Sequence, residues 1–306
     1  MKKVVLLSGG VGGARMARGL AALDDIDLTV VVNVGDDEVF YGLHVSPDLD
    51  TVTYTMAGVE GPDGWGITGD SFTIMERLSQ LGTDTQFRIG DRDLATNLFR
   101  TQELLAGARL SDITARIATA LGAPGTILPA TEHTLRTLIK TAAGEWITFQ
   151  EYFVMRANED EVADLRFDGA AAAAPAPGVL AAIEAAEAVV IGPSNPPLSI
   201  WPILAVNDIA AAVQAAGRVI GVSPLFGGRP LKGPTDRVMA SLGLPGGNTG
   251  VVAAYGGLLH DLVIDTGDAN DREELSELGV KIHVRDTRIA DPTAAWSFAG
   301  WLADLL

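Results

Sequence analysis

The chain has 306 residues, 47% of them hydrophobic, and a mean hydropathy of +0.24, so it can bury a large globular core. Its 39 Asp and Glu against 22 Lys and Arg give a formal net charge of −17. This charge repels nucleic acid and anionic membranes, and we expect neither as a partner. The lack of cysteine excludes disulfides, thiolate metal sites and cysteine nucleophiles, and it is typical of a cytoplasmic protein.

The amino-terminal segment predicts a strand, a glycine-rich turn, a helix and a second strand. The apolar run Val4–Leu7 leads into the glycines, and apolar residues then recur at helical spacing over Ala14–Leu23. The β-branched run Leu28–Asn33 predicts the next strand. This order is typical of the start of a doubly wound, mostly parallel, Rossmann-like α/β sheet.

The middle of the chain differs from its two ends. Helical periodicity recurs in Thr73–Leu81, Asp93–Gly107 and Ser111–Leu121, and Trp146–Met155 is predicted as a strand. Apolar strand patterns return in Ala188–Ile191, Val219–Val222, Leu262–Asp265 and Val280–Val284. We therefore expect residues 1–64 and 186–306 to form a Rossmann-like core, and residues 65–185 to form a mostly helical insertion.

The glycine-rich turn is a candidate anion site. Gly9, Gly10, Gly12 and Gly13 allow the backbone to approach a phosphate closely, and the following helix offers free N–H groups at its N-terminus. No Gly-Lys-Ser/Thr follows, so the turn is not a Walker loop, and the dinucleotide fingerprint fits only loosely. A tight turn with close helix packing is the structural alternative.

Two acidic clusters follow the second predicted strand. Asp36 and Asp37 lie just beyond its carboxyl end, where open α/β sheets bind ligands. Asp48 and Asp50 are close enough in sequence to reach the same crevice, and in an extended segment both would point the same way. Mg²⁺ commonly bridges such carboxylates to substrate phosphates, so the spacing indicates a metal site. Turn and helix-capping aspartates are the alternative.

Further motifs extend the pattern over almost the whole chain. With Asn33–Asp37 and Ser46–Thr51, the set comprises Gly64–Gly66, Ile89–Thr96, Arg100, Ile127–Ala130, Phe149–Tyr152, Gly192–Pro196, Val222–Pro224 and Asp291–Pro292. In this order they resemble the 2-phospho-L-lactate transferase family of coenzyme F-420 biosynthesis. Ser46 is a departure, since some members have cysteine there.

The resemblance implies a Mg²⁺-dependent, typically dimeric transferase, so we expect a homodimer. Such an enzyme moves 2-phospho-L-lactate or phosphoenolpyruvate from a guanosine-diphosphate-activated donor to the ribityl hydroxyl of the deazaflavin FO. GMP leaves, and the product is F-420-0 or its dehydro form. Lactyl, enolpyruvyl and glyceryl donors differ by small groups, so the sequence leaves the donor open.

The matched motifs also imply roles for the aspartates and for the glycine turn. Asp36 is expected to hold Mg²⁺, with Asp48 or Asp50 as further ligands. Asp50 is also the expected general base toward the FO hydroxyl. The glycine turn is expected to hold the donor phosphates through backbone N–H groups.

Four other residues of the matched motifs are expected to contact substrates. Asp91 and Arg92 are expected to contact FO, and Ser194 and Asn195 to hold the guanosine part of the donor. Each pair has a structural alternative: an ion pair that fixes a helix start, and a plain turn.

Aromatic and basic residues are further candidates outside this set. Tyr54 and Trp65 could stack on the deazaflavin ring or belong to the core. Arg229, Lys232 and Arg237 could offset the donor charge or decorate the surface.

Two other functions compete with catalysis of this transfer. A related family of non-catalytic nucleotide-sugar-binding regulators shares the glycine turn and an acidic turn, but lacks the motifs Pro47–Asp50 and Gly90–Asp93 seen here. A nicotinamide-dependent dehydrogenase is suggested only by the glycine turn, and the paired aspartates after the second strand disfavour it.

Overall fold

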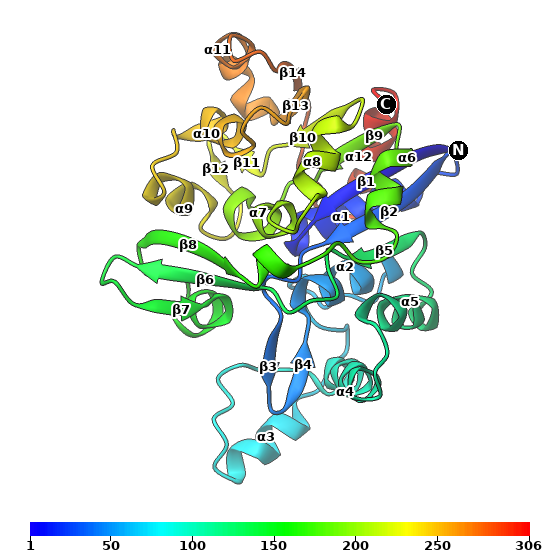
Figure 1. The fold of residues 1–306 in the computed structure, drawn as a ribbon, viewed down its shortest axis with the longest axis vertical. Helices are drawn as coiled ribbons and strands as arrows, with labels where there is room; N and C mark the ends of the chain where they lie inside the picture. Colours follow the sequence, from blue (N-terminus) through cyan, green and yellow to red (C-terminus); the bar gives the residue numbers. More distant parts are fainter.

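A seven-stranded parallel sheet forms the centre of the computed structural model, which describes residues 1–306 (Figure 1). The strands are β1 (Lys2–Ser8), β2 (Ile26–Val32), β5 (Thr126–Pro129), β9 (Ala188–Ile191), β10 (Val219–Val222), β13 (Asp261–Ile264) and β14 (Lys281–Val284). Their order is β14-β13-β10-β9-β1-β2-β5, and every pairing is parallel. β9, β10 and β13 are buried at every residue, as a parallel sheet covered on both faces requires. The predicted doubly wound α/β sheet is confirmed.

The strand order reverses at β1. This strand pairs with β2 on one side and with β9 on the other, so the chain winds away from β1 in both directions. In open α/β sheets the crevice outside the carboxyl ends of two such strands is the usual ligand site. The loops that follow β1 and β9 therefore lie at the position where a site is expected.

Helices cover both faces of the sheet. α1 (Gly10–Ala21) packs against α12 (Pro292–Ala303), and Gly19 allows this close approach, because a Cβ there would lie 2.4 Å from the carbonyl oxygen of Ala295. α6 (Val179–Ala185) and α8 (Ile209–Ala215) pack together, and the right-handed crossovers usual for parallel strands put them on the opposite face from α1.

A second group of elements lies beside the β2 and β5 end of the sheet (Figure 1). It comprises β3 (Glu38–Phe40), β4 (Leu43–Val45), α2 (Pro47–Ala57), α3 (Thr73–Gln80), α4 (Asp91–Leu105) and α5 (Leu110–Leu121). α2 packs against α1 and α5, and α4 packs against β4 and α5. This packing brings α2 and α4 next to the carboxyl end of β2. The three predicted mid-chain helices correspond to α3, α4 and α5.

A small antiparallel sheet lies at the side of the molecule, in the order β7-β6-β8 (Figure 1). Its strands are β6 (Arg136–Thr141), β7 (Trp146–Thr148) and β8 (Val162–Asp168), and a six-residue apolar cluster including Tyr152 packs beneath it. The strand predicted over Trp146–Met155 ends at Thr148, and a π-helical turn η1 (Glu151–Met155) follows. Residues 65–185 therefore contain four α-helices and this sheet, and they also contribute β5 to the main sheet.

The remaining elements are short. They are η2 (Ala170–Ala172), η3 (Pro196–Ile200), α7 (Trp201–Leu204), β11 (Leu225–Phe226), β12 (Arg229–Pro230), α9 (Thr235–Ser241), α10 (Gly247–Ala254), η4 (Thr266–Asp271) and α11 (Arg272–Ser276). The two termini lie on the same side of the molecule, and Lys2 Nζ donates to the carbonyl oxygen of Ala303 at 2.9 Å (Figure 1). No single helix has the length and apolar composition to cross a membrane. One pair of helical segments, Pro196–Leu204 and Ile209–Ala215, is long and apolar enough when taken together, but the two are bent by 93° relative to each other.

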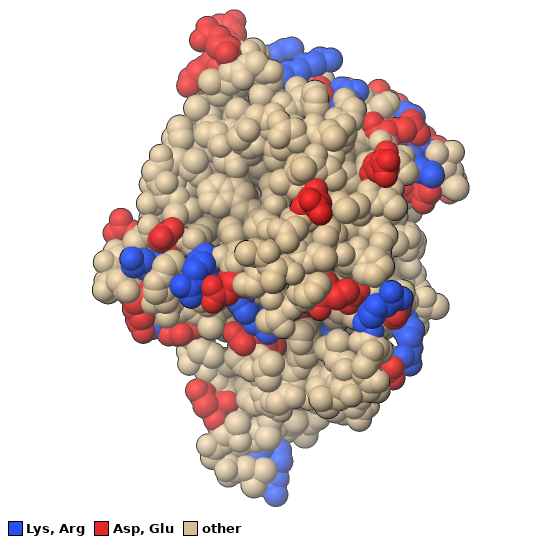
Figure 2. All heavy atoms as spheres, in the orientation of Figure 1, with Lys and Arg blue, Asp and Glu red and all other residues tan.

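Charged side chains are unevenly spread over the face shown in Figure 2. Acidic and basic groups gather at the ends and in a band across the middle, and the area above this band is largely uncharged. The two acidic clusters are not part of this surface charge, because Asp36, Asp37, Asp48 and Asp50 are all buried. Burial of four carboxylates needs a specific compensating arrangement.

Candidate active site

The first acidic cluster lies on the turn that follows β2. Asn33 Oδ1 accepts from the N–H of Gly35 at 2.7 Å, which fixes the turn. A Cβ on Gly35 would lie 2.6 Å from Thr137 Oγ1, so only glycine fits between this turn and the small sheet. Asp36 and Asp37 follow directly and are each 3% exposed. The turn thus directs two carboxylates into the protein rather than toward solvent.

The second cluster lies in the first turn of α2, so the condition of an extended segment, in which both side chains would point the same way, is not met. Pro47 begins the helix, and two positions along a helix differ by about 200°, so Asp48 and Asp50 point in different directions. Asp48 faces the glycine turn: its Oδ1 accepts from Gly10 N–H at 2.6 Å and its Oδ2 accepts from Asn33 Nδ2 at 2.9 Å. Asp50 faces α4, where its Oδ1 accepts from Arg100 Nη2.

Asn33 brings the two clusters together. Its Nδ2 donates to Asp48 and also to Asp36 Oδ1 at 3.2 Å, so these carboxyl groups are neighbours. Burial, together with the charges of Asp48 and Asp37, raises the pKa of Asp36 well above its usual range. Burial likewise raises the pKa of Asp48 to about 6, although the hydrogen bonds from Asn33 and Gly10 oppose this. A cation at this point would relieve both effects.

Asp37 belongs to the same cluster, although the sequence interpretation assigned it no role. Its Oδ2 accepts from Ser46 Oγ at 2.8 Å and lies 2.9 Å from His44 Nε2, while its Oδ1 is buried without a partner. The departure at Ser46 therefore has a structural role, because a hydroxyl is a stronger donor to a carboxylate than a thiol. The adjacent pair of aspartates in the motif was the signal that pointed to it.

The glycine turn is shaped mainly by close packing. A Cβ on Gly9 would lie 2.5 Å from Asp48 Oδ2, one on Gly12 would lie 2.4 Å from the carbonyl oxygen of Pro193, and one on Gly13 would lie 2.3 Å from Ser8 Oγ. Gly10 differs, since its φ of +65° favours glycine and nothing lies within 4 Å of a Cβ there. Packing therefore does not require glycine at position 10, and its N–H donates to Asp48 inside the chain.

Ser194 and Asn195, on the loop after β9, reach the crevice at the switch point. Ser194 Oγ donates to the carbonyl oxygen of Gly9 at 2.7 Å and accepts from its N–H at 3.2 Å, so it joins this loop to the glycine turn. Asn195 Oδ1 accepts from Leu198 N–H at 3.1 Å and caps η3. Both side chains thus have structural partners inside the chain.

Asp91 and Arg92 begin α4 and form hydrogen bonds to the preceding segment, residues 68–74. Asp91 accepts from Ser71 Oγ at 2.6 Å and from the N–H groups of Thr73 and Ile74 at 3.2 and 3.1 Å, and these bonds lower its pKa. Arg92 Nη1 donates to the carbonyl oxygen of Thr68 at 2.7 Å. The hydrogen-bond partners of this pair are residues of the preceding segment, and none of them belongs to the acidic clusters.

The two aromatic candidates have different environments. Tyr54 is 1% exposed and donates to Asp93 Oδ1 at 2.9 Å, so its ring belongs to the core. Trp65 is 48% exposed, and Lys232 Nζ lies 5.8 Å from the centre of its ring. Arg237 donates to Asn158 Oδ1 at 2.6 Å. Trp65 and Lys232 therefore remain available at the surface, whereas Tyr54 does not.

The carboxylates of the site meet the modest ligand requirement of Mg²⁺. No group of three or more His, Asp or Glu side chains comes together as a metal cage. Mg²⁺ needs fewer, since it is usually held by one or two carboxylates and substrate phosphates. Asp36 and Asp48 supply such a pair, and Asp37 Oδ1 and Asp50 Oδ2 are buried oxygens without partners. These residues fit the ion.

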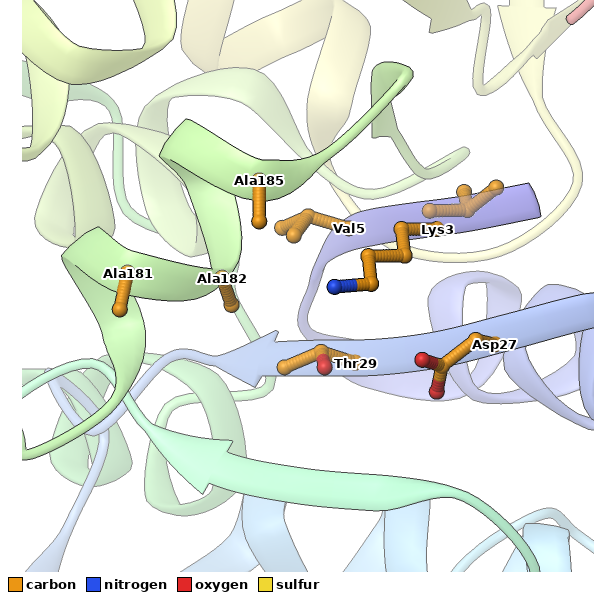
Figure 3. Close-up of a pocket in the computed structure, with 8 residues that line it drawn as sticks. Lys3, Val5, Asp27, Thr29, Ala181, Ala182 and Ala185 are labelled. Atoms are coloured by element: carbon orange, nitrogen blue, oxygen red, sulfur yellow. The ribbon is translucent and has the colours of Figure 1, made fainter. Parts of the chain in front are cut away.

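Two hollows lie away from this cluster. One of about 250 Å³ lies beneath α6, where Ala181, Ala182 and Ala185 face Lys3 and Thr29 (Figure 3). The other, of about 480 Å³, lies beside α12 and the end of β14. Neither contains a residue of the acidic clusters, so we locate the candidate site by its chemistry, at the carboxyl ends of β1, β2 and β9.

Fold and site together define a class: a doubly wound α/β protein with a buried carboxylate cluster at its switch point. The family model described as "2-phospho-L-lactate transferase CofD" matches residues 4–288. A "Phosphoenolpyruvate transferase" of Streptomyces griseus is 40% identical over 97% of this chain and 96% of its own. A "2-phospho-L-lactate transferase" of Methanopyrus kandleri is 37% identical over 94% of this chain and 93% of its own.

The chain belongs to the 2-phospho-L-lactate transferase CofD family, and it is a transferase. The family predicted from the motifs is confirmed. A crystal structure of a upf0052 family protein from Bacillus halodurans aligns with a TM-score of 0.65 at 18% identity, covering 94% of this chain and 93% of its own. At that identity the likeness concerns the fold alone.

Proposed function

We propose that the chain transfers 2-phospho-L-lactate or phosphoenolpyruvate from a guanosine-diphosphate-activated donor to the ribityl hydroxyl of FO, and releases GMP. The observation that carries this proposal is the cluster of four buried aspartates at the carboxyl ends of the strands. Phosphoryl transfer depends on positioning and on neutralising charge, and such a cluster can do both when a metal ion binds. The names of the relatives support the two acids proposed.

On the metal side, Asp36 and Asp48 would hold Mg²⁺, with Asp37 Oδ1 close by in the same cluster. The ion would neutralise charge on the donor phosphates. Without the ion, Asn33 holds the two carboxyl groups together by donating to both. The N–H of Gly10 is the point at which a phosphate oxygen would compete with Asp48.

On the acceptor side, Asp50 would act as the general base. Its Oδ2 is buried and free, so it can accept the hydroxyl proton while the hydroxyl oxygen bonds to the phosphorus that carries the acid. The bond between that phosphorus and the bridging oxygen breaks, and GMP leaves with that oxygen. Burial raises the pKa of Asp50, although Arg100 opposes this, and a raised pKa suits a base.

Substrate contacts farther from the phosphorus are also part of the proposal. Asp91 and Arg92 would contact FO, and the half-exposed ring of Trp65 would stack on the deazaflavin. Ser194 and Asn195 would lie against the guanosine part of the donor at the switch point. We also propose that the enzyme acts as a homodimer in the cytoplasm.

The proposal is tested by measuring GMP release with FO and each of the two donors. We expect Asp50→Ala and Asp36→Ala each to lower turnover by about 10² to 10⁴, the range for a lost general base or a lost charge-stabilising group. The Asp36 variant should also lose its response to Mg²⁺. Near-normal turnover in either variant would remove the role given to that residue.

The unchanged protein provides the broader test. If it binds a guanosine nucleotide but releases no GMP with either donor, the non-catalytic regulator becomes the better description. Competition between lactyl and enolpyruvyl donors in one assay identifies the acid that the pocket selects.

A further inference from the structure

Arg100 is the only buried Lys or Arg in the chain. It lies on α4 at 2% exposure and is the largest of the fully buried side chains. The charges of Asp50 and Asp37 act on it directly, and Asp36 and Asp48 are buried in the same cluster. An arginine at such a position needs a specific partner, because burying a guanidinium without one is costly.

The two terminal nitrogens of Arg100 have different partners. Nη2 donates to Asp50 Oδ1, while Nη1 donates to Asn97 Oδ1 at 2.7 Å and to the carbonyl oxygen of His44 at 3.4 Å. Asn97 is itself fully buried, and its Nδ2 donates to the backbone carbonyl oxygen of Asp93 at 2.9 Å. Hydrogen bonds to α4 and β4 therefore hold the guanidinium in place independently of its contact with Asp50.

This arrangement leaves the two oxygens of Asp50 unequal. Oδ1 is engaged by Arg100, and Oδ2 is buried without any partner in the chain. A buried carboxylate oxygen without a donor is unusual, and it indicates a group that a ligand would satisfy.

We propose that Arg100 is a positioning residue for the transfer: it holds Asp50 by Oδ1 and directs the free Oδ2 toward the incoming acceptor hydroxyl. This inference rests on the proposed function of Asp50. Arg100 itself touches neither substrate and acts only through the carboxylate. The planar guanidinium matters for this role, because it binds Asp50 and Asn97 at once in a fixed geometry.

The role predicts a particular pattern of kinetic losses. In Arg100→Met, kcat should fall about 10²-fold, while the KM for the donor and the Kd for FO should stay within about threefold. FO binding is measured separately, from the fluorescence of the deazaflavin ring. Arg100→Lys keeps the charge and should recover part of kcat, but not all of it. Arg109→Met, which removes an exposed arginine paired with Asp112, is the matched control and should keep full activity.

A double-mutant cycle separates positioning from a merely structural effect. If Arg100 acts through Asp50, then Arg100→Met should cost less than about threefold when Asp50 is already Asn, because the interaction is absent. Equal fold-losses in the two backgrounds would overturn the inference, as would normal kcat in Arg100→Met. If Arg100→Met does not fold, the same cycle is run with Arg100→Lys.

The result also separates this inference from the proposed function. If the unchanged protein releases no GMP with either donor, the proposed function fails and the inference falls with it. If the unchanged protein turns over and the losses are additive, only the assignment of Arg100 fails.

Discussion

Neighbouring aspartates have different partners because local geometry separates them. Asp48 and Asp50 are two residues apart, yet the first turn of α2 directs one to the glycine turn and the other to α4. Asp36 and Asp37 diverge as well, toward Asn33 and toward Ser46. One ion need not contact all four groups, so this geometry is compatible with the proposed division between a metal ion and a general base.

The sequence identified the carboxylates of the candidate site but not the groups that hold them. Asp36, Asp48 and Asp50 were predicted because carboxylates near the end of a buried strand indicate chemistry. Asn97 and Arg100 lie about fifty residues away from α2, and only the packing of α4 brings them near. Asp48 and Asp50 would point the same way only in an extended segment, and they do not, because Pro47 takes the first position of a helix.

At the residue scale, Asp93 predicts a pH dependence of stability. Burial, reinforced by Asp50, raises its pKa to about 7, so the folded chain holds a proton that the unfolded chain releases above about pH 4. The free energy of unfolding should therefore fall as pH rises from about 4 to 7, by up to about 1.4 kcal/mol per unit, and then level off. Asp93→Asn should flatten this slope in urea titrations.

A control is needed for that slope, because other groups titrate in the same range. Asp112 is exposed and paired with Arg109, so Asp112→Asn should leave the slope between pH 5 and 7 unchanged. Parallel curves for the unchanged protein and Asp93→Asn would contradict the assignment.

At the scale of elements, the glycines at the start of α1 show that a sequence pattern cannot separate a ligand-binding glycine from one required by packing. Gly9, Gly12 and Gly13 read as a phosphate-binding turn, but each also lies against another part of the chain. The phosphate-binding role of the turn stays a prediction. A glycine that a ligand needs and a glycine that packing needs look identical until the neighbouring loop is known.

Two helical glycines allow this packing to be measured. A Cβ on Gly12 would meet the carbonyl oxygen of Pro193 at 2.4 Å, whereas a Cβ on Gly300 in α12 would meet nothing within 4 Å. Gly12→Ala should therefore lower the free energy of unfolding by about 1 to 3 kcal/mol. Gly300→Ala should raise it by about 0.5 to 1 kcal/mol, since alanine favours helix. Urea titration measures both, and equal effects would contradict the packing argument.

At the scale of the whole molecule, buried strands were the most predictable part. β9 and β10 match their predicted bounds, because strands buried on both faces are continuous apolar runs between polar loops. In the small sheet only β7 overlaps a predicted strand, because β6 alternates between half-buried and buried residues and β8 is largely exposed, so neither is a continuous apolar run. β5 lies at the edge of the sheet, begins with the exposed Thr126 and ends at Pro129, so it lacks the continuous apolar run that marks β9 and β10.

The balance of charge in the interior predicts how the molecule responds to Mg²⁺. Asp36, Asp37, Asp48 and Asp50 are buried with one arginine among them, and the charges of Asp48 and Asp37 add to the burial that raises the pKa of Asp36. An ion bound only by the folded chain adds RT ln(1 + [Mg²⁺]/Kd), about 2.7 kcal/mol at a hundredfold excess over Kd. We therefore expect the melting temperature to rise with MgCl₂ beyond its change in NaCl of equal ionic strength. Asp36→Asn should abolish that difference, and an equal rise in this variant would place the ion elsewhere.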